Sequence, residues 1–498
     1  MSKKLYDFMD KEVFRLQKVS IRNLKNVKNG AVTFPTFNDR KFTYSSDKSE
    51  IVGLYGQNGS GKTTLVLALE ILKDLLIGNS LNNSLFEDIT VTEKSCDLEF
   101  VLSYEEEGKQ HCLIYYDVTI TKREDREVFI SNEKIAIRNL LGNAFKVDLF
   151  EAKVKGDDVN IHPIEALRKK LQKDKKKSAD LYILHRKSLK ESRSYLFASD
   201  LLDLLESYEN NPATGLLGYI SIWMVKFALR DLTIINNKSH SQIETDDKLN
   251  FFYRVRDSYG LISLNIAKAT YLSEKNNETI TKIINQMNKV INTIIPNLKL
   301  ELKEVDKITS LDTDKVKIAV DLLSNRDGNL IPFRNESAGI KKIISILSAL
   351  ISVYNNKSYC LVIDELDSGV FEYLLGELLT VIDRYGKGQL VFTSHNLRPL
   401  EVLKSKSIWF TTNNNDDDNK NRYVRIPNVR GTNNLRSIYF NKIILGDEKV
   451  DLYDSTSTYN ISHAFRNASN LGTIEVNEKY VEELSDLFDM DYSVKKNG

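Results

Sequence analysis

Cysteine is scarce in this sequence, with three residues in 498. Cys96, Cys112 and Cys360 are far apart and odd in number, and the six histidines do not cluster with them. This usage is typical of a reduced intracellular protein, and it provides neither a disulfide framework nor the ligand spacing of a zinc site. A small scaffold held together by disulfides or metal is therefore excluded.

An excess of charge of either sign is also missing. Lys and Arg number 70 and Asp and Glu number 69, which gives a formal net charge of +1. No global field therefore attracts the protein to nucleic acid or to a membrane surface. Any such binding must come from a local patch.

Long hydrophobic runs are absent as well. The first residues, MSKKLYDFMDKEVF, lack the apolar core and cleavage site of a signal peptide. The longest apolar stretch, Gly215 to Leu229, is interrupted by Lys226 and is short for a membrane span. We therefore expect a buried helix there, a cytoplasmic protein and no membrane partner.

Strand patterns occupy the first third of the chain. FRLQKVSIRNLKNVKNGAVTF alternates apolar and polar residues in two runs around KNG, and EIVGLYG predicts a third strand. CDLEFVLSYEEEGKQHCLIYYDVTI predicts a hairpin that turns at EEEGK. Strand patterns return later in LKLELKEV, KVKIAVDLL, YCLVIDEL and QLVFTSHN.

The period changes to that of a helix between about residues 160 and 299, as in ETITKIINQMNKVINTII. We interpret this range as a helical insertion, and heptads are not sustained across it. The expected division is an N-terminal lobe over 1–159, the helical insertion over 160–299, a C-terminal lobe over 300–430 and an extension over 431–498. The polar run TTNNNDDDNKNR predicts a solvated loop.

The strongest chemical signal is GQNGSGKTT, which matches G-x-x-x-x-G-K-[ST] between an apolar strand and a helical pattern. Its glycines let successive backbone N–H groups point at phosphate oxygens, next to the positive end of the following helix. Lys62 would bring its charge to the β- and γ-phosphates, and the Thr63 hydroxyl would ligate Mg²⁺. The predicted nucleotide-binding residues are Gly56, Gln57, Asn58, Gly59, Ser60, Gly61, Lys62, Thr63 and Thr64.

Two acids end a second buried strand, in CLVIDELDSG. Charged side chains are costly at such a position unless they bind a ligand or a partner, and ligands of open α/β sheets sit at this edge. We expect Asp364 to hold the Mg²⁺ shell and Glu365 to polarise the water that attacks the γ-phosphate. A third strand, VFTSHN, ends at His395, which we predict to be a γ-phosphate sensor.

Together, GQNGSGKTT, ESAGIKK, LVIDELD and TSHN resemble the motifs of ABC-type ATPase heads of the SMC, Rad50 and RecF kind, and especially of bacterial AAA15-like ATPases of phage defence and abortive infection. The resemblance implies an α/β fold: a P-loop sheet with an N-terminal antiparallel β-subdomain, interrupted by the helical insertion. The cofactors would be ATP and Mg²⁺.

The resemblance also implies a signature motif at NESAGIKK. In such ATPases, its Ser and Gly contact the γ-phosphate of ATP bound to the opposite subunit, which here would be Ser337 and Gly339. A capped core helix is an equally valid description of this stretch, because Asn335 or Ser337 can cap an apolar helical face. A glutamine-loop residue is not evident, and Gln110 beside the hairpin turn is the one candidate.

The resemblance implies an ATP-dependent switch that forms homo-oligomers through ATP-sandwich dimers and controls a separately encoded effector, often a nuclease. The alternatives are an ATP-gated nuclease toxin with its own active site and an SMC- or RecF-like DNA-repair ATPase. The run from Arg168 to Lys177 carries seven cations. It is typical both of a DNA or RNA contact and of a solvated lysine-rich face.

Overall fold

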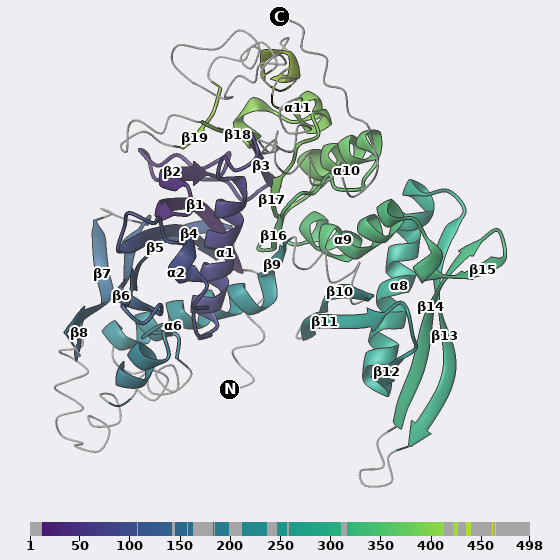
Figure 1. Cartoon of the computed structure of the whole chain (residues 1–498), viewed down its shortest axis with the longest axis horizontal. Helices are drawn as coiled ribbons and strands as arrows, with labels where there is room; N and C mark the ends of the chain where they lie inside the picture. Colours follow the sequence, from purple (N-terminus) through teal and green to yellow (C-terminus); the bar gives the residue numbers. More distant parts are fainter. Residues whose placement is uncertain are drawn as a thin grey trace, which may run out of the picture.

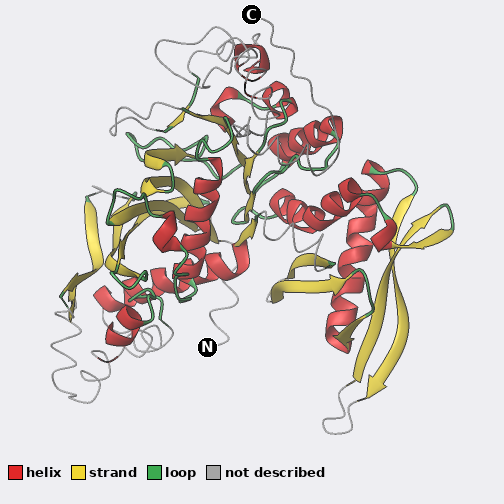
Figure 2. Cartoon of the chain, in the orientation of Figure 1, coloured by secondary structure: helices red, strands yellow, loops and turns green. Residues whose placement is uncertain are grey.

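The structure, a computed structural model, describes residues 12–106, 108–141, 145–156, 158–162, 183, 185–198, 212–236, 247–255, 258–309, 316–412, 422–426, 435–439, 461 and 464. Figures 1 and 2 show a body built on two sheets, joined through helix α9 to a smaller unit of strands around helix α8. The basic run 168–177 lies outside these residues.

A six-stranded sheet forms the centre of the body. Its order is β19-β18-β3-β17-β16-β9, and every pairing is parallel except that of β19 with β18. The strands are β3 (Glu50–Tyr55), β9 (Leu232–Ile235), β16 (Cys360–Ile363), β17 (Gln389–Thr393), β18 (Ile408–Thr411) and β19 (Tyr423–Val424). Because parallel strands end at the same edge, the polar residues that follow β3, β16 and β17 meet there.

A seven-stranded antiparallel sheet packs beside it, in the order β2-β1-β4-β5-β6-β7-β8. Its strands are β1 (Glu12–Leu24), β2 (Val27–Thr33), β4 (Ser95–Glu106), β5 (Lys109–Lys122), β6 (Val128–Asn139), β7 (Lys146–Lys155) and β8 (Asp158–His162). The short helix α2 (Leu85–Asp88) lies between β3 and β4 in the chain. The predicted α/β fold with an N-terminal antiparallel β-subdomain is thus confirmed.

Strand β3 is buried on both faces, and its alternation assigns its side chains to two cores. Val52 and Leu54 join the core shared with helix α1 (Lys62–Leu76) and the antiparallel sheet. Ile51 and Tyr55 join the core on the opposite face, beneath helices α9 (Ala338–Asn355) and α10 (Glu372–Tyr385), while helix α11 (Arg398–Val402) packs on α10. The sheet therefore lies between two apolar layers.

Helix α9 belongs to two cores at once. Ile343 and Ile346 face the central sheet, whereas Ile344 and Leu347 face the smaller unit. Among the described helices, α9 is the one long and apolar enough to qualify as a membrane span, and 61% of it is buried inside the protein. It is the shared core helix that connects the two units.

The range predicted to be a helical insertion is helical only in part. Helix α8 (Glu274–Ile294) confirms the pattern quoted from it, and helix α6 (Pro212–Lys226) with its π-helical end Phe227–Asp231 confirms the buried helix. Strands stand beside them: β9, β10 (Lys248–Val255), β11 (Ser258–Asn265) and β12 (Thr270–Ser273). The helix-only prediction is wrong there, because short runs such as LTII pair with neighbouring strands. The limits at 160 and 299 stay a prediction.

The smaller unit continues past residue 299. Strands β13 (Leu298–Thr309), β14 (Val316–Arg326) and β15 (Asn329–Pro332) form a sheet with β12, and α8 packs on it through Ile284, Met287 and Ile291. This confirms the strands expected in LKLELKEV and KVKIAVDLL. They belong to the unit around α8, whereas the expected division assigned them to the C-terminal ATPase lobe.

The first hairpin turns three residues earlier than the sequence pattern indicated. The predicted turn was KNG, but β1 and β2 pair from Leu24 and Val27 outward, which leaves Lys25 and Asn26 as the turn. Lys25 has a φ of 52°, in the left-handed region that turns often require. Gly30 lies inside β2, where a Cβ atom would stand 2.6 Å from the ring of Tyr423.

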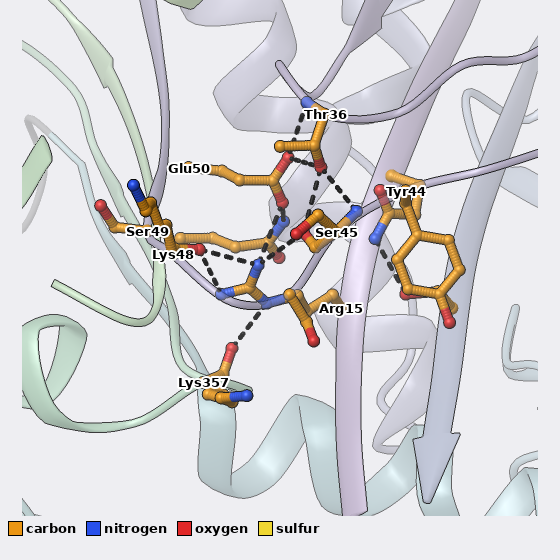
Figure 3. A network of polar contacts seen from close by, with 12 residues as sticks. Arg15, Thr36, Tyr44, Ser45, Lys48, Ser49, Glu50 and Lys357 are labelled. Carbon is orange, nitrogen blue, oxygen red and sulfur yellow. Dashed lines mark hydrogen bonds and ion pairs between the residues drawn. The ribbon is translucent and has the colours of Figure 1, made fainter. Parts of the chain in front are cut away.

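A buried polar network joins the two sheets at the amino ends of β3 and β17 (Figure 3). The Arg15 guanidinium lies 3.3 Å from a Glu50 carboxylate oxygen, with both side chains fully buried. It also donates to the carbonyls of Lys357 and Lys48. Gln389 bonds the backbone of Leu16 through both amide atoms and donates to Glu50 at 3.0 Å. These bonds fix β1 against the central strands.

Candidate nucleotide site

A cavity of about 450 Å³ opens at the carboxyl ends of β3, β16 and β17. The loop after β3, the acids after β16 and the His after β17 all reach it. Its described lining residues are Lys25, Asn26, Asn58, Gly59, Gly61, Lys62, Thr63, Thr64, Asp364, Glu365, Thr393 and His395. Folding thus brings the loop together with two motifs that follow it about 300 residues later in the sequence.

Glycine is required at two points of the loop after β3. Gly56 has a φ of 152°, and a Cβ there would lie 1.7 Å from the Thr411 hydroxyl. Gly61 has a φ of 106°, and its Cβ would lie 2.8 Å from Val27. Gly61 is also the N-cap of α1, so the loop curls directly into the positive end of that helix.

Lys62 is buried in the loop that it belongs to. Its ammonium donates to the carbonyls of Gly56 at 2.8 Å and Gln57 at 3.0 Å. Burial lowers the pKa of Lys62, and the charges of Asp364 and Glu365 oppose that shift. A phosphate group would bring negative charge to the same ammonium.

Asp364 presents a buried oxygen that lacks a hydrogen-bond partner. Its Oδ1 accepts from the Thr393 hydroxyl at 2.6 Å, while Oδ2 has no partner. The side chain is otherwise enclosed, with the residue only 1% exposed. A buried carboxylate oxygen without a donor is costly, and a cation satisfies it. Asp364 and the Thr63 hydroxyl line the same cavity, so their chemistry fits the oxygen ligands of Mg²⁺.

Glu365 follows in an unusual backbone conformation. Its φ is 52°, which is uncommon for a residue other than glycine, and its N–H donates to the Thr393 hydroxyl at 2.8 Å. The left-handed turn directs the chain away from β16 while Glu365 still lines the cavity. Strain of this kind is found at functional positions.

His395 is held by its backbone beside the acids. Its N–H and that of Asn396 donate to one oxygen of Asp367, at 3.1 and 2.9 Å. Burial lowers the pKa of His395, the positive charge of Lys62 lowers it further, and the three acids oppose both effects. The neutral imidazole is therefore favoured near neutral pH.

Lys25 and Asn26 are site residues that the sequence pattern did not predict. Asn26 donates to the Gly59 carbonyl and accepts from the Thr64 hydroxyl at 3.4 Å. Lys25 brings a second cation to the cavity and pairs with Asp88 at 3.6 Å. The sequence signal for these residues was a Lys-Asn turn between two strands. The prediction missed it because it placed the turn at KNG.

Other contacts hold the loop from behind. Arg422 donates to the Ser60 carbonyl at 2.9 Å, Tyr423 donates to the Gly61 carbonyl at 2.8 Å, and Thr411 bonds the Ser60 hydroxyl at 2.5 Å. Three predicted nucleotide-binding residues, Gly56, Gln57 and Ser60, are not among the residues that line the cavity. Gln110 also lies outside the lining and donates to the Tyr44 carbonyl at 2.5 Å.

The predicted signature residues lie outside this cavity as well. Ser337 is exposed and caps α9 by accepting from the Ile340 N–H at 3.4 Å, so Ser337 and not Asn335 is the cap. A Cβ on Gly339 would stand 2.4 Å from the Gly369 carbonyl, so α9 and the turn after β16 are in close contact. Lys342 extends this contact, with its ammonium 3.4 Å from the Glu365 carbonyl.

The fold and cavity are those of a P-loop nucleotide-binding domain, in which a parallel sheet presents a glycine-rich loop at the start of its first helix. A family model described as "AAA domain, putative AbiEii toxin, Type IV TA system" matches residues 51–401, which is more than half of the chain. The chain therefore belongs to this family of AAA ATPase domains. No curated protein matches the sequence.

Solved structures of related architecture align over most of the chain. The SMC head domain from Thermotoga maritima is 13% identical, covers 83% of this chain and 99% of its own, and has a TM-score of 0.36. A Pyrococcus furiosus Smc head domain bound to a ScpA domain is 9% identical, with 80% and 93% covered and a TM-score of 0.31. The recombination mediator RecF with ATP is 15% identical, with 78% and 94% covered and a TM-score of 0.31.

Proposed function

We propose that the protein is a molecular switch that binds and hydrolyses ATP between two copies of the chain. The observation that carries this proposal is the buried Asp364 oxygen without a partner, placed in one cavity with Lys62, Thr63 and Glu365. In a cavity with only a structural role, burying that oxygen without a hydrogen-bond partner would destabilise the fold. A cavity for a nucleotide and its cation explains it.

The binding roles follow from the charges and hydrogen-bonding groups that line the cavity. Backbone N–H groups of the loop and the Lys62 ammonium would hold the phosphates, and Lys25 would add a second positive charge near the turn. Thr63 and Asp364 would hold Mg²⁺, which supplies neutralisation of phosphate charge when bound.

Two residues are assigned to the reaction. Glu365 would accept a proton from the attacking water, since it is an acid that lines the cavity next to Asp364. His395 would donate a hydrogen bond to the γ-phosphate, for which its lowered pKa leaves a neutral imidazole. Each role is a proposal drawn from position and residue type.

The signature would complete the site of a second copy. Ser337 and the N-terminus of α9 are exposed and lie outside the lining of their own cavity, so their free N–H groups are available to an anion on a neighbouring molecule. The contact from Lys342 to the Glu365 carbonyl offers a route by which movement of α9 would reach the catalytic acid.

Mixing two inactive chains tests this arrangement. Ser337→Arg blocks the signature, and Lys62→Ala disables the loop, so each variant alone should lose hydrolysis. In a head-to-head dimer of the two, one composite site keeps an intact loop and an intact signature. Phosphate release by the mixture should recover part of the parent rate.

The mixture would stay inactive if both composite sites must hydrolyse ATP together. Crosslinking gives the decisive result because it does not depend on activity. Ser337→Cys on one chain and Asn58→Cys on the other should crosslink only when nucleotide is added. Cys112→Ser in both chains removes the one natural cysteine that is not fully buried. Crosslinks confined to single chains would refute the two-copy site.

The regulated partner is proposed at the level of its class. Membership of a family whose description names an abortive-infection toxin supports a role in bacterial anti-phage defence. The effector would be a separately encoded protein, with a nuclease as the expected kind. Neighbouring genes and copurification with the intact chain would identify it.

The same description favours one second candidate, a toxin that carries its own active site. A nuclease assay on the purified chain separates the two functions: cleavage of RNA or DNA that Lys62→Ala abolishes would support the toxin. The predicted nucleic-acid contact at residues 168–177 stays a prediction, and so does the cytoplasmic location.

A further inference from the structure

A groove in the smaller unit takes no part in the nucleotide site. It has a volume of about 440 Å³ and lies between α8, α9 and β10. Phe252, Ile283, Met287 and Ile351 give it an apolar floor. An apolar hollow of this size on the outside of a core helix is characteristic of a surface that receives another segment.

The rim of the groove is positively charged. Lys275 and Lys282 line it from α8, and their spacing of seven residues places them on one face of that helix. Both are exposed, and neither pairs with a carboxylate in the part of the chain that the structure describes. The N-terminus of α8, capped by Ser273, adds the positive end of the helix dipole near Lys275. The complementary occupant is apolar on one face and acidic beside it.

The sequence itself contains such a segment. Residues 475–491, EVNEKYVEELSDLFDMD, hold seven acids and a single lysine. Tyr480, Leu484 and Leu487 recur at the spacing of one helical face, with Phe488 beside them, while most of the acids fall on the opposite face. The segment lies outside the described residues, so the proposal rests on its sequence and on the groove.

We propose that residues 475–491 dock as an amphipathic helix in the groove between α8 and α9 of the same chain. The apolar face would cover Met287 and Ile351. Glu483 and Asp491, the two acids that do not fall on the opposite face, would meet Lys275 and Lys282. The tether permits this. Tyr439 stacks on Phe410 of the central sheet at 5.0 Å, and the roughly 35 residues that follow can span on the order of 100 Å when extended. A tethered segment also has a high effective concentration.

Docking would have a consequence for α9. Ser348, Ile351 and Ser352 form one wall of the groove, on the helix that Ser337 begins. A segment held there would brace α9 against α8 and so bias how the signature meets a second copy. This consequence rests on the proposed function, whereas the docking itself does not.

The test uses the full chain with p-benzoylphenylalanine at position 488. After illumination without nucleotide, mass spectrometry should find adducts on peptides that contain Met287 or Ile351. Lys275→Glu combined with Lys282→Glu should lower the adduct yield roughly fivefold or more, because two attractions become repulsions. Lys299→Glu with Lys303→Glu is the matched control: both lysines are exposed in the same unit and neither lines the groove.

Isotope labelling decides which chain provides the segment. In a dilute mixture of labelled and unlabelled protein, adducts should join peptides of one label. Adducts between peptides of different label would overturn the proposal in favour of docking between copies. Adducts that map to other peptides would also overturn it, and so would an equal loss of adduct yield in both double variants. Because no nucleotide is present, these outcomes are independent of ATP hydrolysis.

Discussion

The amino and carboxyl edges of the central parallel strands each carry a buried carboxylate, and the two carboxylates differ in their hydrogen bonding. Glu50 begins β3 and Asp364 follows β16, and each residue is 1% exposed. Both oxygens of Glu50 are occupied, one by Thr36 and the other by Arg15 and Gln389. One oxygen of Asp364 has no partner.

The difference teaches how to separate a structural carboxylate from a functional one. Burial alone does not do so, since both acids are equally enclosed. The hydrogen bonding of these two acids does: Glu50 is satisfied within the fold, whereas Asp364 combines an open oxygen with a place in the lining of a cavity that a cation could enter. Mutations at the two ends should therefore affect different quantities.

The largest expected effect is at the carboxyl end. Glu365→Gln should lower the ATPase rate by about 10²–10⁴-fold, since it removes the proposed base but keeps the shape of the side chain. Nucleotide binding and the unfolding midpoint should stay close to those of the parent. Phosphate release and fluorescent-nucleotide titration measure the two functions, with the exposed Glu377→Gln of α10 as the control. Parent-like turnover in Glu365→Gln would remove the residue from its assigned role.

The amino end should respond in stability instead. Arg15→Met leaves the Glu50 carboxylate buried without its cation and should lower the free energy of unfolding by about 3–5 kcal/mol. Arg40→Met, at an exposed position in the segment between β2 and β3, should change it by less than about 0.5 kcal/mol. Urea unfolding followed by circular dichroism provides the comparison. Adding Glu50→Gln to Arg15→Met should recover part of the loss, and a single variant as stable as the parent would contradict the structural role.

The smallest effect links two groups of the nucleotide site. Lys62 lowers the pKa of His395 through its charge, so Lys62→Met should raise that pKa toward the ordinary histidine value. The sign follows from removing a positive charge that disfavours the imidazolium. NMR titration of the imidazole signal, assigned with His395→Gln, measures it in the absence of nucleotide. A downward shift would show that the two side chains do not interact as described.

Short motifs predicted several of the residues that line this cavity. The loop after β3 and the acids after β16 each depend on residues adjacent in the chain, where steric freedom at glycine and the cost of a buried charge are readable one stretch at a time. The turn at Lys25 and Asn26 was not predictable in this way. Its position follows from how β1 and β2 pair. Gly30 was the reason for placing the turn at KNG, but a glycine is needed there because a side chain would clash with the ring of Tyr423.

The Arg15 network was beyond sequence reasoning for a related cause. Arg15 and Lys357 are 342 positions apart, and Leu16 and Gln389 are 373 apart. An arginine in an alternating strand gives no sign that it will be buried, because most of its partners are backbone carbonyls that any residue would supply and its one carboxylate partner, Glu50, lies on another strand. Strand β9 was beyond sequence reasoning as well, because its four residues are a strand only through their pairing with β16.

The sequence by itself determined the class of chemistry: a phosphate-binding loop, two acids after a buried strand and a histidine after the next, each fixed by local backbone geometry and residue type. Tertiary structure decided which of these groups share one cavity, which additional residues join them and which buried carboxylate is left with an open oxygen. The physical reason is that hydrogen-bond satisfaction depends on groups brought together across hundreds of residues, and only the packed sheets fix those distances.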